Sequence, residues 1–410
     1  MRDKRTRARR GALVALTIAL AGVWTFAATR LWRTSVPDDL ESPRLDERDY
    51  FPASLLEEAS SYTTFLDVTD VLSGLALLVA LGVFAVRGAA FARESAAGRI
   101  GTGMLLGMLA LAFVWIAQLP FGLARLWWQR RHDTTEIGYL EWLADYWAIA
   151  GAQFLFISLA LLIVMALAGV WRRWWWLAAA PALAAVAVAF TFVQPYLLPG
   201  LEPVRDPRIA ADVRLIAAVQ GISEPDVRVL NTYGATEAPN AFAAGLGPSE
   251  RVVLWDTLVE DFDRPEVRIV IAHELGHLSR DHIWKTLAWM ALIALPTAFV
   301  VGLATRRRGG IYEPAAVPLA VFVVAVALIA VSPLDRAFSQ RLEAEADWVA
   351  LETTRDPEAT EALFAGFASG ALIDPSPAGW SDAVLATHPS TMSRIEMAAA
   401  WASRHGSDRP

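Results

Sequence analysis

The chain has 410 residues, of which 55% are hydrophobic and only 19% are charged, and its formal net charge at pH 7 is -7. Soluble domains are on average about 45–50% apolar and about 25% charged. The apolar excess excludes a disordered or collagen-like chain, and the negative charge argues against nucleic acid as a partner. The absence of cysteine excludes a disulfide framework, a thiol nucleophile and a cysteine-ligated zinc site. This composition predicts a membrane protein in which any metal site uses histidine and carboxylate ligands.

A membrane-spanning helix needs about 20 mostly apolar residues, and seven stretches of the chain meet this requirement. In chain order they cover about residues 11–28, 68–86, 104–123, 147–170, 174–193, 284–304 and 315–331. The first follows an arginine-rich stretch, as a signal peptide would, but its length and the later spans favour an uncleaved anchor. Tryptophans cluster beside the spans, and indole rings favour the headgroup level of a bilayer. We expect a mostly α-helical polytopic membrane protein with about seven transmembrane helices.

Basic residues are unevenly distributed among the segments that connect the spans. The N-terminal segment and the connections near 87–99, 172–173 and 306–313 hold 14 basic and three acidic residues. The alternate segments, 29–67 and 120–145, hold seven basic and 13 acidic residues. The positive-inside rule then predicts a cytoplasmic N-terminus. Because five spans precede the first large polar segment, we expect that segment on the extracytoplasmic face.

We expect four regions along the chain. Residues 1–194 form a membrane region with five spans, 195–283 the first part of a polar domain, 284–332 a transmembrane hairpin, and 333–410 the second part of that domain. The two polar parts are long enough for one mostly helical domain with its own core. A small β-hairpin is predicted within 242–255, and the arginine- and alanine-rich composition favours a bacterial plasma membrane.

The clearest chemical motif lies in a predicted helix that begins near Asp263, where a capping box with Glu266 is expected. His273 and His277 are four residues apart, so both imidazoles project from one helix face at a separation that one Zn²⁺ can bridge. Glu274 lies beside them and can accept a proton from a metal-held water without being a ligand. This HExxH pattern predicts a zinc hydrolase site. The alternative is a pair of histidines that serve as ordinary N–H donors on a half-buried face.

Two histidines leave a zinc site short of one protein ligand if water keeps the fourth position. Glu343 and Asp347, directly after the last span, are four residues apart and share a helix face, whereas Glu345 points elsewhere. The transmembrane hairpin leaves and returns on one membrane face, so it can bring these residues beside His277. One carboxylate can complete the ligand set and the other can orient an imidazole. The alternative is a solvated acidic helix face.

At this point the chain resembles a known family, the membrane zinc metallopeptidases that comprise the CAAX prenyl proteases and the HtpX-type heat-shock proteases. The resemblance rests on HELGH at 273–277, the transmembrane hairpin, and SQRLEAEAD at 339–347. It implies that Glu343 is the third zinc ligand and that Asp347 supports a ligand histidine. The number of spans is nearer to the seven-span CAAX protease branch.

The resemblance extends to two further segments. PNAFAAGLGPSERVVLWDTLVE at 239–260 is similar to the strand pair before the family's metal helix, which implies that Asn240 binds substrate. THPSTMSRI at 387–395 is similar to the family's C-terminal His-Pro segment, with His388 as a catalytic residue and Arg394 at the substrate site. From the residues themselves, Asn240 can equally be a turn residue, and Arg394 can pair with a nearby acid. His388 can donate to an oxyanion or be a surface histidine, and His282 is left outside the ligand set.

Together these features predict a zinc-dependent membrane metalloendopeptidase with one Zn²⁺ per chain that hydrolyses peptide bonds of membrane-associated proteins or peptides. The CAAX branch implies lipidated or anchored C-termini as substrates, and the HtpX branch implies misfolded membrane proteins. Both branches imply an active site that faces the cytosol, which differs from the orientation that the arginines predict. The alternatives outside this class are a transporter, for which the spans lack mid-membrane ionisable residues, and a catalytically silent scaffold, which would be expected to lose Glu274.

Overall fold

The computed structural model describes residues 21–93, 97–232 and 239–406. Within these ranges, six helices are long and apolar enough to cross a membrane by length and composition. They are α2 (Ala53–Arg87), α3 (Gly98–Arg131), α4 (Tyr139–Trp171), α5 (Trp175–Leu197), α9 (His282–Thr305) and α10 (Val317–Thr354). They coincide with six of the seven expected spans. Of the expected first span, residues 11–20 lie outside the described residues, and residues 21–31 are helical.

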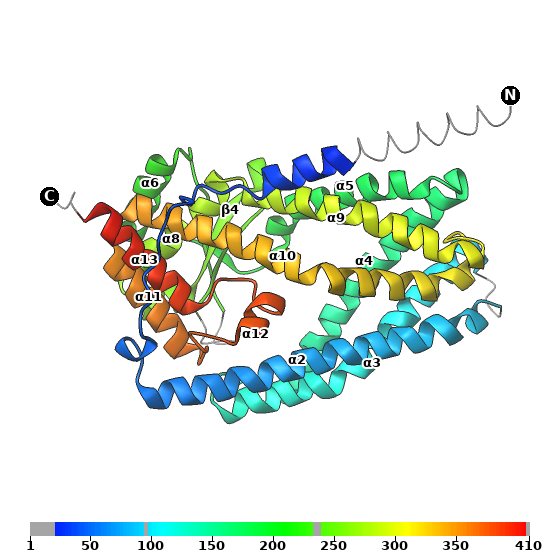
Figure 1. Cartoon of the computed structure of the whole chain (residues 1–410), viewed down its shortest axis with the longest axis horizontal. Helices are drawn as coiled ribbons and strands as arrows, with labels where there is room; N and C mark the ends of the chain where they lie inside the picture. Colours follow the sequence, from blue (N-terminus) through cyan, green and yellow to red (C-terminus); the bar gives the residue numbers. More distant parts are fainter. Residues whose placement is uncertain (1–20, 94–96, 233–238, 407–410) are drawn as a thin grey trace.

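The spans run side by side as one elongated bundle, and the polar domain lies at one end of it (Figure 1). In this bundle α2 packs on α3, α3 on α4, and α5 on α9. Gly103 and Gly107 let α3 and α4 approach closely, because a Cβ atom there would lie 2.1 Å from Met165 Sδ and 2.2 Å from Leu161 Cδ1. The expected mostly α-helical membrane fold is therefore confirmed.

A four-stranded sheet forms the base of the polar domain, in the order β1-β2-β4-β3. The strands are β1 (Leu201–Pro203), β2 (Val227–Leu230), β3 (Ala241–Ala244) and β4 (Arg251–Trp255). The predicted hairpin is present as the antiparallel pair β3–β4, in which Ala241 faces Leu254. The sheet also contains a parallel β2–β4 pair and an antiparallel β1–β2 pair, so β3 is an edge strand.

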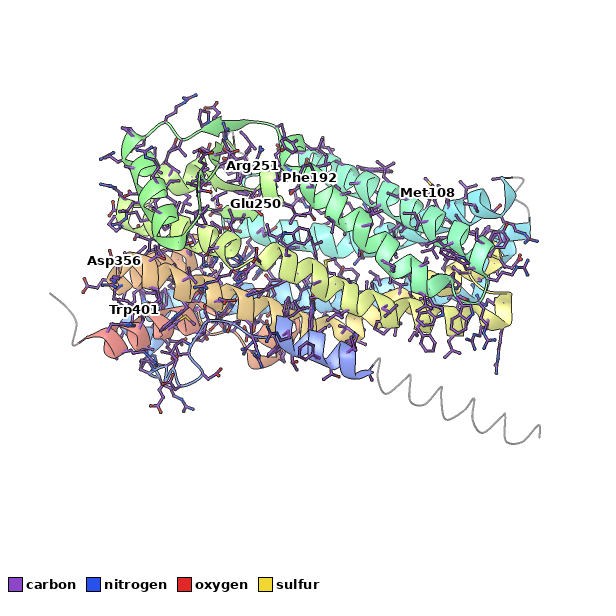
Figure 2. The ribbon with its side chains drawn as sticks, turned by 90° about the horizontal axis from the view of Figure 1, so that it is seen from above. Met108, Phe192, Glu250, Arg251, Asp356 and Trp401 are labelled. Atoms are coloured by element: carbon purple, nitrogen blue, oxygen red, sulfur yellow. The ribbon has the colours of Figure 1, made fainter. Side chains whose placement is uncertain are left out.

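Short helices cover this sheet and complete the polar domain. They are α6 (Pro207–Gln220), α7 (Asp256–Asp261), α8 (Arg264–Ser279), α11 (Pro357–Gly370), α12 (Gly379–Val384) and α13 (Thr391–His405). Five 3-10 turns connect elements: η1 (Glu47–Asp49), η2 (Gly88–Arg93), η3 (Gly247–Ser249), η4 (Arg306–Arg308) and η5 (Pro314–Ala316). The domain core includes Leu254 and Ile271, which are fully buried, and Leu363. Figure 2 shows Asp356 and Trp401 at the polar end of the molecule, away from Met108 in the bundle.

The chain passes between the membrane bundle and the polar domain through one continuous helix, α10, and through a tight turn between α8 and α9. α10 is a single helix of 38 residues that continues from its apolar half, past Pro333, into the polar domain. α8 is followed directly by α9, and Asp281 between them adopts a left-handed backbone conformation with φ of 55°. This turn sets the direction in which α9 leaves α8. The polar domain is therefore joined directly to the start of α9 and to the C-terminal part of α10.

Candidate metal centre

The first two side chains of the site come from one face of α8. Its N-terminus is stabilised as expected, because the backbone N–H of Asp263 donates to the Glu266 carboxylate at 2.9 Å. The helix then buries nearly every side chain from Val267 to Gly276 against the domain core. His273 and His277 lie one turn apart on this helix, and their Nε2 atoms are 3.1 Å from each other. Both imidazoles therefore present the same ring nitrogen to the same point in space.

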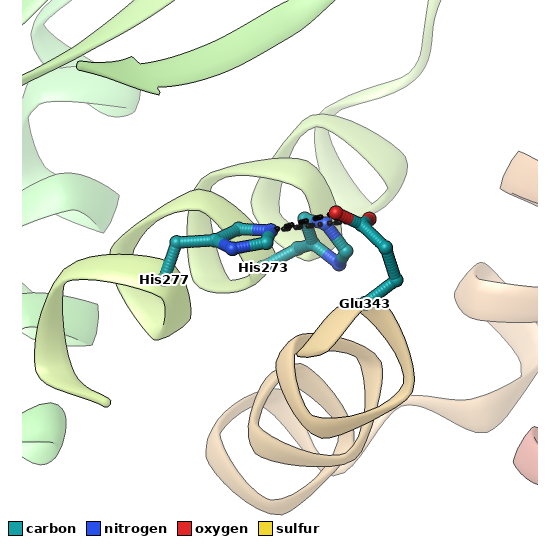
Figure 3. A group of neighbouring side chains, drawn as sticks. All are labelled: His273, His277 and Glu343. Carbon is teal, nitrogen blue, oxygen red and sulfur yellow. Dashed lines mark hydrogen bonds and ion pairs between the residues drawn. The ribbon is translucent and has the colours of Figure 1, made fainter. Parts of the chain in front are cut away.

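α10 brings a carboxylate to the two imidazoles. Gly276 faces α10, and a Cβ atom at this position would make ordinary van der Waals contact, 3.4 Å from Val349 Cγ1 and 3.5 Å from the backbone of Ala346. Glu343 faces the histidines from this helix (Figure 3). Its carboxylate oxygens lie 3.3 Å from His273 Nε2 and 3.6 Å from His277 Nε2. The three ligand atoms all fall within 4.8 Å of one another.

The chemistry of these donors fits a metal ion. Two ring nitrogens and a carboxylate oxygen converge on one point. Within the described part of the chain, Glu343 Oε2 is buried and has no hydrogen-bond partner. Buried polar atoms are nearly always paired, so an orphaned carboxylate oxygen among imidazoles indicates a cation.

Glu274 is the buried acid beside this cluster. Its side chain is almost fully enclosed, and it lines the same cavity as the two histidines. Burial raises the pKa of the Glu274 carboxyl to about 7, against the opposing effects of the His273 charge and a backbone hydrogen bond from Ala243. A carboxyl group with a pKa near neutrality can both accept and release a proton.

Asp347 holds His273 from the side opposite the proposed metal position. Its Oδ1 atom accepts a hydrogen bond from His273 Nδ1 at 2.8 Å. Arg394 from α13 donates to both carboxylate oxygens, through Nε at 2.8 Å and Nη2 at 2.6 Å, and its guanidinium lies over the Phe364 ring at 3.9 Å. A proton on Nδ1 leaves Nε2 of His273 free as a ligand atom.

Comparison with known proteins relates the residues of the metal-site cluster to a known family. The sequence model described as Peptidase family M48 matches residues 203–402, which are just under half of the chain and include every residue of the cluster. The expected family resemblance is therefore confirmed. The match to this metallopeptidase family implies a metal ion at the centre.

Individual relatives of this chain come from both branches that the sequence resembles. It is 28% identical over 244 residues to the uncharacterized metalloprotease YhfN of Bacillus subtilis, which covers 55% of this chain and 56% of that protein. It is 32% identical to the CAAX prenyl protease 1 homolog of Dictyostelium discoideum, over 32% of this chain and 31% of that protein. It is 27% identical to the protease HtpX homolog of Methylibium petroleiphilum, over 46% of this chain and 72% of that protein. The chain thus spans about half or less of the first two relatives.

The solved structure of S. mikatae Ste24p resembles nearly the whole chain in fold. The match has a TM-score of 0.71 and covers 92% of this chain and 96% of that one, at 15% sequence identity. At this identity the likeness concerns the fold alone. It includes the membrane helices as well as the polar domain, and supports an integral membrane protein.

Three further predicted residues have different placements. His388 lies between α12 and α13, lines the cavity, and has its Nε2 3.3 Å from Glu343 Oε2. Its Nδ1 is held by Thr387 Oγ1 at 2.9 Å. Asn240 is exposed, and its side-chain oxygen accepts the backbone N–H of Ala241 at 2.9 Å, as the turn interpretation expects. Arg394 pairs with Asp347 rather than lining the cavity, which is the alternative that the sequence left open for it.

The cavity itself has a volume of about 360 Å³ and lies where the polar domain meets the membrane helices. One wall is β3, through Ala241, Phe242 and Ala243. The opposite wall is the start of α9, with Ile283, Leu287 and Met290. The metal-site cluster is therefore open to a space that is polar at one end and apolar towards the membrane.

The sequence interpretation placed His282 outside the ligand set and did not foresee its contacts. His282 is buried, and its Nδ1 lies 2.9 Å from Nδ1 of His277. Its Nε2 lies 3.0 Å from Oε2 of Glu345, which points away from the Glu343 face as expected. The available signal was a third histidine five residues after His277, but its orientation depends on the turn at Asp281.

Proposed function

We propose that this protein is a zinc-dependent integral-membrane metalloendopeptidase that hydrolyses peptide bonds of membrane-associated proteins or peptides. The observation that carries the proposal is the convergence of His273, His277 and Glu343 beside the buried carboxyl group of Glu274 in one cavity. Two imidazoles and one carboxylate form a ligand set that zinc uses in hydrolases, with one position left open. Bound zinc in such a set supplies Lewis acidity.

Each catalytic task falls to a named side chain. Glu274 accepts a proton from the attacking water and delivers it to the leaving amine nitrogen, because its carboxyl group has a pKa near neutrality and adjoins the ligands. His388 donates to the oxyanion that develops on the scissile carbonyl. Asp347 keeps the proton of His273 on Nδ1.

The edge strand β3 provides a binding mode for an extended peptide. Among the residues that the structure describes, β3 pairs only with β4, and three residues of β3 line the cavity. A peptide that adds to this edge by backbone hydrogen bonds passes in front of Glu274. The apolar wall from α9 then receives substrate side chains on the membrane side. These features support substrates associated with the bilayer.

The orientation of the site follows from the distribution of arginines. The connections rich in arginine meet at the end of the bundle remote from the metal centre, as the contact of Arg308 with Ala85 and the pairing of Arg99 with Glu313 illustrate. We assign this end to the cytoplasm of a bacterial plasma membrane and the metal centre to the opposite face. Activity of a reporter that functions only in the cytoplasm, fused after residue 410, would overturn this orientation.

The deciding experiment replaces Glu274 by glutamine. Glu274→Gln removes the base but no metal ligand, so we expect proteolysis to fall by about 10²–10⁴-fold while one zinc per chain is retained. The measurement compares new protein N-termini in membranes that contain the wild type or the variant, together with the zinc content of the purified proteins. Near-wild-type proteolysis by Glu274→Gln with normal zinc content would contradict the mechanism. If the wild type itself cleaves nothing, the result would favour a silent scaffold.

The matched control for this experiment is Glu266→Gln on the same helix. Glu266 caps the N-terminus of α8 and is remote from the cavity, and glutamine can keep the capping interaction. Proteolysis by this control is expected to equal that of the wild type. A loss as large as that of Glu274→Gln would assign the effect to the folding of α8 rather than to chemistry.

Removal of the His388 side chain is expected to lower proteolysis less than the Glu274→Gln substitution does. Its side chain is 58% exposed, so His388→Ala is expected to leave the fold and the zinc content unchanged. Removal of an oxyanion donor typically lowers the rate by about 10²–10³-fold, and we expect kcat to fall in that range on a peptide substrate. The control is His405→Ala at the end of α13, which is not expected to change kcat. Equal kcat for wild type and His388→Ala would remove His388 from the mechanism.

A further inference from the structure

A second cavity lies at the end of the membrane bundle opposite to the metal centre. It has a volume of about 310 Å³ and is formed by the α4–α5 connection and the α9–α10 connection. α9 separates the two cavities, because His282 at its start belongs to the first and Arg306 just after its end lines the second. With 24 residues, α9 places them about 36 Å apart along its axis.

The lining of this cavity combines positive charge with aromatic rings. Arg172 and Arg173 come from one connection and Arg306 from the other, while Trp175, Trp176 and Phe299 provide apolar surface. No acidic residue lines it, and no ion pair of these three arginines is found in residues 21–93, 97–232 and 239–406. Arginine from two separate connections therefore meets in one concave site without a counter-charge.

The N-terminus of α5 adds to this positive potential. α5 begins at Trp175, which lines the cavity, and no side chain caps its first turn. A helix of 23 residues carries a partial positive charge at this end, and its first N–H groups are available as donors. Guanidinium groups and helix N-termini both recognise phosphate.

The position of the cavity indicates the source of the phosphate. It lies where two apolar spans, α5 and α9, reach their ends, at the level where headgroups of a bilayer and indole rings meet. A basic pocket between membrane helices at this level fits an anionic lipid headgroup. We propose that this cavity, which we call the basic cavity, binds the phosphate headgroup of an anionic membrane lipid.

The test uses neighbouring arginines that differ only in their position relative to the cavity. Arg306 lines the basic cavity, whereas Arg307 belongs to the same turn, η4, is also exposed, and does not line it. The preference of the purified protein for phosphatidylglycerol over phosphatidylcholine is measured by native mass spectrometry and by thermal stabilisation. Arg306→Gln is expected to lower this preference roughly fivefold, and Arg307→Gln to leave it unchanged.

Combined substitution strengthens the test. Arg172→Gln, Arg173→Gln and Arg306→Gln together are expected to lower the preference by on the order of 100-fold, while the melting temperature in phosphatidylcholine stays that of the wild type. Equal losses from Arg307→Gln and Arg306→Gln would overturn the proposal, because they would indicate membrane charge in general. Equal stabilisation by soluble glycerol phosphate would overturn it in favour of a free anion. Neither outcome depends on the peptidase activity.

A separate observation, on the metal centre itself, carries a second inference. A ligand imidazole that offers Nε2 to a metal keeps its proton on Nδ1, and for His277 that nitrogen faces only 2.9 Å from Nδ1 of His282. If His277 donates, His282 accepts and holds its own proton on Nε2, which donates to Glu345 Oε2 at 3.0 Å. The two hydrogen bonds require one consistent set of tautomers.

The end of this chain of hydrogen bonds is firmly held. Lys285 Nζ donates to Glu345 Oε2 at 2.8 Å, and the backbone N–H of Ser35 donates to Oε1 at 2.7 Å. We infer that His282 is a positioning residue: the Glu345 carboxylate holds His282, and His282 in turn orients His277. This inference rests on the proposed zinc site.

The experiment compares the two side chains, His282 and Lys285, that donate to the same Glu345 carboxylate. His282→Leu removes the partner of His277, whereas Lys285→Met removes a partner of Glu345 and leaves His282 in place. We expect zinc affinity, measured by competition with a chelating dye, to fall about 10–100-fold in His282→Leu and clearly less in Lys285→Met. His282→Gln, which can accept from His277 and donate to Glu345, should restore part of the affinity.

The outcomes separate this inference from the proposed function. Equal zinc affinity in His282→Leu and Lys285→Met, at equal loss of melting temperature without metal, would show that His282 only stabilises the buried carboxylate and would overturn the inference. A wild-type protein that binds no zinc would instead overturn the proposed metal centre.

Discussion

α13 carries an arginine near each of its ends, and each arginine pairs with an aspartate. Arg394, at the start of the helix, contacts Asp347, and the two side chains are 13% and 3% exposed. Arg404, at the end of the helix, contacts Asp39 at 3.1 Å, and these side chains are 42% and 77% exposed. The residue types are the same, but the surroundings are opposite.

The difference indicates which of these two ion pairs affects the metal centre. The buried aspartate has a second partner, His273, so a change at the pair reaches the metal centre directly. The exposed pair is surrounded by water and screened by salt. If burial and the contact with His273 decide the effect, substitutions in the two ion pairs must differ strongly.

The largest effect is expected for Asp347→Asn. This change leaves the Arg394 charge buried without its counter-charge and weakens the hold on His273, so zinc affinity should fall about 10–100-fold. Removal of one partner from a buried pair also typically costs about 3–5 kcal/mol of stability. Zinc competition and thermal unfolding measure the two effects. Zinc affinity equal to that of the wild type would show that the carboxylate does not support His273.

An intermediate effect is expected for Arg394→Lys. Lysine keeps the charge but cannot form the two parallel hydrogen bonds of the guanidinium group. The free energy of unfolding should fall by about 1.5–3 kcal/mol, the contribution of a charged hydrogen bond, and zinc affinity should fall less than in Asp347→Asn. A loss of affinity as large as that of the aspartate variant would mean that geometry, not charge, controls the pair.

The smallest effect is expected for Asp39→Asn, the counterpart of Asp347→Asn at the exposed end. Because Arg404 stays solvated when its partner is removed, the melting temperature and the zinc affinity should both equal those of the wild type. The same measurements in 0.1 M and 1 M salt should give no difference between variant and wild type. A change in the zinc affinity of Asp39→Asn would show that the exposed ion pair also affects the metal centre, which would contradict the difference between the two pairs.

The sequence predicted those parts of the molecule that depend on local periodicity. The six described spans, the start of α8 and the hairpin β3–β4 all follow from apolar runs, a capping box and turn residues. The opposite directions of Glu343 and Glu345 follow from the helical repeat alone. β1 and β2 escaped prediction because strands of three and four residues carry no readable alternation.

The partners of His282 and Arg394 were beyond prediction for a different reason. The contact of His282 with His277 depends on the left-handed turn at Asp281, which determines how α9 leaves α8. The pairing of Arg394 with Asp347 depends on how α13 docks against α10, over 47 residues of intervening chain. Such distances are set by packing between helices rather than by the pattern within one of them.

Because α10 is continuous, the distance of the metal centre from the membrane can be measured along this helix. Its apolar run ends near residue 331 and Glu343 follows 12 residues later in the same helix, so the site of hydrolysis stands up to about 18 Å from the hydrocarbon boundary. An extended tether covers about 3.4 Å per residue. A bilayer-anchored substrate therefore needs no more than about five or six extended residues between its anchor and the bond that is cut.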